Sequence, residues 1–255
     1  MKALIKLHAK ENFKGSSFLI FGILGSIITL IIIFQVKFSI EGVAATSDYA
    51  VFGMQWKLLS MIASLGAISL SMNTMAFHRR GTRKELLWLH GLEPEKQYFA
   101  LILGNLLVSI AMAFVLSIPM MIQILVKGLD FPWYSIVFSF IAYGITVCTA
   151  CVFYSLWTFI LSPAVSALLG MVFIVMGTVR TTFLLLLGNK GGLFGKLGKY
   201  LIHILPPLDE LSQITRDLFT GGAVDLPVVF RILLYLWLLL GMVYFVIKWV
   251  VQYEK

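Results

Sequence analysis

The histidines and serines of this sequence are the side chains whose chemistry is easiest to recognise, and their spacing argues against a reactive centre. The histidines are scattered, with no pair at metal-ligand spacing: His8, His78, His90 and His203. No carboxylate accompanies them inside an apolar run, and the serines of those runs lack a base that would activate them. We therefore predict no catalytic residue and no metal site in this chain.

Two other motifs resemble binding sites but fail on their context. Cys148 and Cys151 have the C-x-x-C spacing of redox and metal sites. They lie in an uninterrupted apolar run without a redox fold, which favours inert buried thiols. Residues 191–197 resemble a phosphate-binding loop, but the spacing is wrong and no hydroxyl follows Lys196. We predict no nucleotide site, so any ATP-driven work requires a second polypeptide that binds ATP and magnesium.

Composition places the chain in a membrane. Of 255 residues, 60% are hydrophobic and 13% are charged, whereas soluble domains are about half apolar and about a quarter charged. The formal net charge is +8, yet the basic residues flank apolar blocks and form no stripe interleaved with aromatics. This distribution favours contact with membrane lipid and excludes nucleic acid as a partner. We predict one all-α integral membrane domain over residues 1–255.

The apolar blocks predict six transmembrane helices, because about 20 apolar residues are needed to cross about 30 Å of hydrocarbon. They cover residues 17–36, 58–77, 98–126, 134–161, 163–187 and 228–250. Pro119 favours a kink in the third helix, and Pro163 indicates a tight turn before the fifth. Between the fifth and sixth, residues 188–227 are expected to be extracellular. They contain an amphipathic helical pattern: Leu208, Leu211, Ile214 and Leu218.

The positive charges near the predicted helix ends indicate orientation. Residues 1–16 carry Lys2, Lys6, Lys10 and Lys14, and a second basic cluster lies between the second and third predicted helices. By the positive-inside rule both segments, and both chain ends, are cytoplasmic in a multi-pass protein of the plasma membrane. Residues 1–16 alternate apolar and basic side chains, which is typical of an interfacial helix. A disordered basic tail is the alternative.

The loop between the second and third predicted helices contains a short helix with clear end signals. Thr82 and Glu85 form a T-x-x-E capping box, Gly91 suits a left-handed helix end, and Pro94 suits the first turn of the next helix. A helix over residues 81–91 would carry a cluster of apolar side chains on the cytoplasmic side: Leu86, Leu87, Trp88 and Leu89. Such a helix is too short to be stable alone and too apolar for water, so it requires a partner surface or lies in the membrane interface.

Few polar side chains lie inside the predicted transmembrane helices. Asn73 and Asn105 are expected to form hydrogen bonds between helices, and Arg180 either pairs with another group or extends to the lipid headgroups. Asn73 and Arg180 are the candidate residues of a transport pathway. A pathway with so few charges suits an apolar or amphipathic cargo better than a small ion.

Over essentially its whole length the chain resembles the permeases of type 2 ATP-binding-cassette exporters. The segment from Arg80 to Leu87, followed by Gly91-Leu92-Glu93-Pro94, is its most family-like motif. The resemblance implies a coupling helix that docks in a groove of an ATPase subunit through these residues: Arg80, Gly81, Thr82, Glu85, Leu86, Leu87, Trp88 and Gly91. It also implies two ATPase subunits, a second permease that makes a homo- or heterodimer, and a pathway bordered by the second and fifth helices.

Two other classes compete with an exporter permease. A non-transporting membrane immunity or interaction protein would bind a toxin or regulator without ATP dependence. An intramembrane enzyme would require inward-facing catalytic side chains, which the sequence does not supply.

Overall fold

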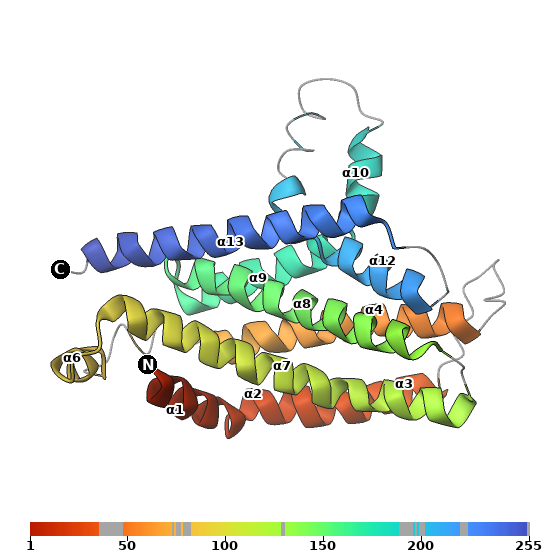
Figure 1. Ribbon diagram of the computed structural model, residues 1–255, viewed down its shortest axis with the longest axis horizontal. Coiled ribbons are helices and arrows are strands. Elements are labelled where there is room, and N and C mark those ends of the chain that lie inside the picture. Colours follow the sequence, from red (N-terminus) through yellow and green to blue (C-terminus); the bar gives the residue numbers. More distant parts are fainter. Residues whose placement is uncertain are drawn as a thin grey trace.

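A computed structural model gives the arrangement of the chain. It describes residues 1–35, 48–72, 74, 78, 83–128, 131–188, 196, 198, 202–219 and 224–253. Every secondary-structure element of these residues is helical, so the predicted all-α class is confirmed (Figure 1). The elements are α1 (Lys2–Phe13), α2 (Ser16–Phe18), the π-helical turn η1 (Leu19–Leu24), α3 (Gly25–Gln35), α4 (Asp48–Ser71), α6 (Arg83–Leu89), α7 (Pro94–Lys127), α8 (Trp133–Thr158), α9 (Pro163–Thr178), α10 (Arg180–Gly188), α12 (Leu208–Phe219) and α13 (Leu226–Tyr253).

Three of these helices, α7, α8 and α13, are long and apolar enough to cross a membrane. They correspond to the third, fourth and sixth predicted segments. The helices Lys2–Phe13 and Ser16–Ile31 pass the same criterion together, with a bend of 59° between them, and α9 is a shorter apolar helix. The outer face of α13 exposes Phe230, Trp237 and Phe245. Because water does not tolerate so continuous an apolar surface, the chain has transmembrane character.

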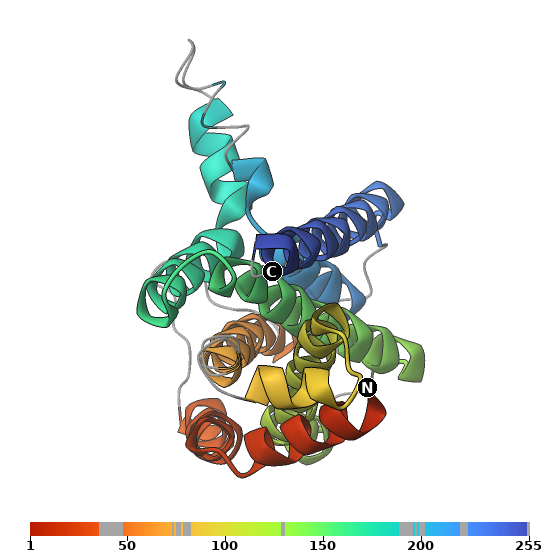
Figure 2. The same cartoon turned by 90° about the vertical axis from the view of Figure 1, so that its left-hand side faces the viewer.

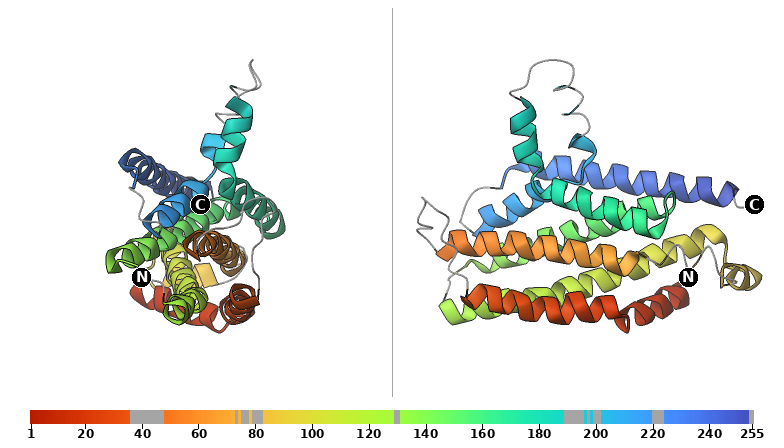
Figure 3. Two further views of the ribbon diagram at one scale, coloured as in Figure 1. Left: turned by 90° about the vertical axis from the view of Figure 1, so that its right-hand side faces the viewer. Right: turned by 180° about the vertical axis from the view of Figure 1, so that it is seen from behind.

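The long helices lie side by side in one bundle. In Figure 1 and Figure 3, α3, α4, α7, α8, α9 and α13 run alongside one another, with successive helices in opposite directions. α4 and α8 are central, since they pack against each other and both also pack against α7, α9 and α12. The chain ends and α6 share one end of the bundle, whereas α12 lies toward the other. Seen end-on, α1 and α6 lie across the bundle axis (Figure 2).

Two predicted segments differ from the observed helices. The second was predicted over residues 58–77, but α4 covers Asp48–Ser71. The observed helix includes Lys57, whose ammonium group lies 2.7 Å from a carboxylate oxygen of Asp209, and this pairing lowers the cost of placing a charge there.

The fifth predicted segment, residues 163–187, is not one continuous helix. α9 ends at Thr178, Val179 leaves the helical region with φ −120° and ψ 18°, and α10 then turns away from the bundle axis (Figure 1). After this turn, Arg180 contacts groups contributed by residues that follow much later in the sequence. The apolar pattern of residues 163–187 could not indicate the helix break at Val179, because Arg180 pairs with His203 and Glu210, which lie outside that segment.

Small residues allow close helix packing. Ala63 and Ala67 of α4 are fully buried. A β-carbon at Gly170 of α9 would lie 2.7 Å from the Tyr154 ring of α8. α9 therefore approaches α8 so closely that only glycine fits at this position.

Candidate functional site

The C-terminal end of α6 has the geometry predicted from Gly91. This glycine has φ +77°, its N–H donates to the Trp88 carbonyl at 2.8 Å, and the Leu92 N–H donates to the Leu87 carbonyl at 3.0 Å. These two bonds form a Schellman motif, which confirms the predicted helix end. Pro94 begins α7, as predicted.

The N-terminal part of the predicted coupling segment cannot be placed in the same way. Arg80, Gly81 and Thr82 lie outside the described residues, so the capping box of Thr82 with Glu85 stays a prediction. Asn73, a candidate pathway residue, also lies outside them. Glu85 falls in the first turn of α6 and is exposed, where a carboxylate interacts favourably with the helix dipole.

α6 presents an apolar face to its surroundings. Leu86 is 55% exposed, Trp88 65% and Leu89 79%, whereas Leu87 is half-buried. The helix lies across the end of the bundle near the start of α7 (Figure 2). Three large apolar side chains on a helix of seven residues are a surface that would gain from being covered.

Gln97 connects this helix to the bundle, although its residue type and position did not mark it as functional. Its side chain is fully buried in the first turn of α7. The Nε2 amide donates to the Leu92 carbonyl at 2.6 Å and to the Lys84 carbonyl at 3.3 Å. One side chain therefore holds both the exit turn and the first turn of α6. The sequence signal that could have identified Gln97 was a polar amide side chain directly before the third predicted transmembrane helix, residues 98–126.

Arg180 lies in a second polar cluster at the base of α10. It is 3% exposed, its Nη2 donates to Nδ1 of His203 at 3.0 Å, and its Nη1 lies 3.8 Å from Oε1 of Glu210. The other carboxylate oxygen of Glu210 lies 3.5 Å from Nε of Arg231 on α13. Arg180 is thus a paired side chain that does not extend into its surroundings.

Asp209, adjacent to Glu210 on α12, completes the charge pairing. It accepts a hydrogen bond from Lys57 of α4 at 2.7 Å and one from the Thr181 backbone N–H at 3.2 Å. The cluster therefore joins α4, α10, α12 and α13 through two carboxylates. Figure 1 shows α10 and α6 well apart, so Arg180 and the α6 residues form no common site.

The electrostatics of this cluster act on His203. A partial loss of hydration lowers its pKa below the usual value, and the positive charges of Arg180 and Arg231 lower it further, while Glu210 opposes them. The neutral imidazole is therefore favoured. This agrees with the geometry, because Nδ1 accepts the Arg180 hydrogen bond and must be unprotonated.

A third polar cluster joins α1 to α7 around Asn105. Its Oδ1 accepts from Nε2 of His8 at 2.9 Å, from Nδ2 of Asn12 at 2.8 Å and from Thr74 Oγ1 at 3.3 Å. The predicted interhelical role of Asn105 is confirmed. Since α1 is a packed helix, the alternative of a disordered tail is wrong.

The described residues contain no group of three or more side chains that could hold a metal ion. Fold and clusters together define an all-helical protein of transmembrane character, with an exposed apolar helix at one end of its bundle. No protein-family model matches the sequence, and no curated protein matches it.

Proposed function

We propose that this chain is the membrane-spanning permease subunit of a type 2 ATP-binding-cassette exporter. It moves an amphipathic or hydrophobic cargo, such as a peptide, an antimicrobial or a lipid-like molecule, out of the cell. The chain itself is not an enzyme. Two copies of a separate ATPase subunit bind ATP and magnesium, and a second permease, identical or different, completes the pathway.

The observation that carries the proposal is the apolar face of α6. Burying a side chain such as Leu86, Trp88 or Leu89 contributes about 1.5–3 kcal/mol, and all three are exposed. Gln97 holds the backbone of α6 from the side of α7, so the helix is positioned before any partner binds. A pre-positioned apolar helix suits the transmission of force better than a flexible loop does.

The proposed topology crosses the membrane six times, through α2 to α3, α4, α7, α8, α9 and α13. The lysines of α1 and the basic residues before α7 favour a cytoplasmic position for the bundle end that carries α6 and both chain ends (Figure 3). The docking helix then faces the compartment that contains ATP. In this arrangement α4 and α9 border the pathway, and Asn73 is its candidate polar residue. Arg180, the other candidate, is buried and paired at the base of α10, so it would have to leave that pairing to face the cargo.

Copurification tests this proposal. The tagged full-length chain is expressed in its own host, and copurifying polypeptides are identified by mass spectrometry and assayed for ATP hydrolysis. The double variant Leu86→Asp, Trp88→Asp should reduce ATPase recovery by about tenfold or more, because two desolvated contacts are lost. The matched control is Trp133→Asp, since Trp133 is 76% exposed and begins α8.

The outcomes separate the classes. ATPase recovery with the native chain and with the control, but not with the double variant, supports coupling through α6. Equal recovery with all three would show that α6 is not the docking element. If the native chain retains no ATPase, an immunity or interaction protein becomes the better interpretation.

A further inference from the structure

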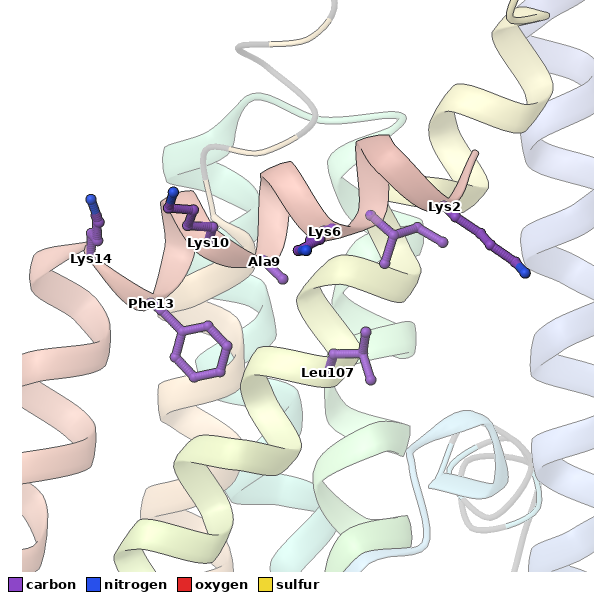
Figure 4. A pocket seen from close by; sticks show the side chains of 8 residues that line it. Lys2, Lys6, Ala9, Lys10, Phe13, Lys14 and Leu107 are labelled. Atoms are coloured by element: carbon purple, nitrogen blue, oxygen red, sulfur yellow. The ribbon is translucent and has the colours of Figure 1, made fainter.

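An open groove of about 570 Å³ runs between α1 and α7 (Figure 4). Its walls are apolar: Ile5, Ala9 and Phe13 line it from α1, and Leu107 lines it from α7. In Figure 4 the Phe13 ring extends from the side of α1 on which Leu107 lies. The groove is therefore a hydrophobic space under a helix that lies across the end of the bundle.

Four lysines border this groove. Lys2, Lys6, Lys10 and Lys14 recur at intervals of four residues, so they follow one side of the helix. All four are exposed. Figure 4 shows Lys10 and Lys14 extending away from the side that carries Phe13. A line of ammonium groups above an apolar space matches a ligand that has an anionic head and a hydrocarbon body.

The apolar wall continues along the outer face of α7. Leu103, Leu107, Ile110, Phe114 and Ile118 are exposed and recur every three or four residues, so they form one stripe. From Leu107 to Ile118 the stripe is about 16 Å long, at about 1.5 Å per residue. This length suits an extended acyl chain that enters from the groove. A free phosphate ion or an acidic peptide would leave the stripe uncovered.

The groove is held in shape by polar contacts between α1 and α7. His8 and Asn12 both donate to Asn105 of α7, at 2.9 Å and 2.8 Å. A β-carbon at Gly104 would lie 2.8 Å from Cδ2 of His8, so glycine permits this close approach. α1 is thus fixed at its angle to the bundle, and a ligand need not order it on binding.

We infer that the groove between α1 and α7 is a binding site for one anionic phospholipid. Lys6 and Lys10, neighbours on one side of α1, contact the headgroup phosphate, and one acyl chain follows Phe13, Leu107 and the exposed stripe of α7. The site does not depend on the exporter proposal, because it uses neither α6 nor the Arg180 cluster. It would fix how deeply this end of the protein sits in an anionic leaflet.

Native mass spectrometry of the purified full-length chain in detergent tests the inference. The probes are palmitoyl-oleoyl phosphatidylglycerol and, as the uncharged-headgroup comparison, palmitoyl-oleoyl phosphatidylcholine. We expect one retained phosphatidylglycerol and weaker phosphatidylcholine binding. The variant Lys6→Gln, Lys10→Gln should weaken phosphatidylglycerol binding by at least about tenfold, since each lysine contributes about fivefold. The control Lys96→Gln, Lys127→Gln removes the same charge from the two ends of α7 and should retain the lipid.

A second variant tests the apolar half of the site with the lysines intact. Leu107→Trp fills the groove and should displace the lipid, whereas Leu168→Trp on α9, also at an exposed position, should not. Equal losses in the site variants and their controls would overturn the inference. So would displacement of the lipid by inorganic phosphate, which would indicate an anion site without an acyl component.

Discussion

Replacing Gln97 by leucine would show whether one buried amide holds α6 against the bundle. The variant removes the hydrogen bonds to the Leu92 carbonyl, at 2.6 Å, and the Lys84 carbonyl, at 3.3 Å. The short bond contributes about 1 kcal/mol and the long one less, while an unsatisfied buried carbonyl adds to the cost. Oε1 of Gln97 has no partner among the described residues, so its loss costs nothing. We expect α6 to open more easily by about 1–2 kcal/mol.

Hydrogen–deuterium exchange measures this opening directly. Amides of residues 83–92 should exchange about 5 to 30 times faster in the variant, since each 1.4 kcal/mol changes the opening equilibrium tenfold. The rest of α7 should keep its protection. Gln123→Leu is the matched control, because Gln123 is also buried but lies near the other end of α7. Unchanged exchange in residues 83–92, or an equal effect of both variants, would refute the role assigned to Gln97.

Two further predictions concern the cluster at the base of α10. Lys57→Met leaves Asp209 largely buried without its 2.7 Å ammonium partner, and it should lower the free energy of unfolding by about 1–2 kcal/mol, a value reduced for the partial exposure of the lysine. Adding Asp209→Asn should recover part of that loss in thermal unfolding, whereas an additive double variant would show that the pair is not coupled. The lowered pKa of His203 means that the unfolded chain binds this proton more readily, so stability should fall as the pH drops below about 6.5. His203→Asn should reduce that fall, and an identical pH profile for both proteins would contradict the assigned environment.

The local features of the fold followed from single residues and their neighbours. Gly91 ends α6 in a Schellman motif, and Pro163 begins α9 after a tight turn. The pattern that includes Leu208 and Leu211 forms α12 with both side chains buried. Such signals are readable because backbone preference and apolar periodicity are carried by a residue and by neighbours within one or two turns.

Only part of the candidate site could be predicted from the sequence, because only its local features depend on neighbouring residues. The apolar residues of α6 were identified because Leu86 and Trp88 lie between clear helix-end signals. Gln97 was missed because its two acceptors are backbone carbonyls, which every residue possesses. Because a backbone carbonyl does not depend on residue type, only the folded structure shows which carbonyls the buried Gln97 amide reaches.

The sequence by itself determined the all-helical class, the transmembrane character and the ends of several helices, because composition and local punctuation decide these properties. Only the tertiary structure decided that Lys57 could lie within α4 and that α9 and α10 are separate helices. Lys57 and Asp209 are 152 residues apart, and Arg180 and Glu210 also come from different helices. The cost of placing a charge in an apolar segment depends on the partner that packing supplies, which no local pattern contains.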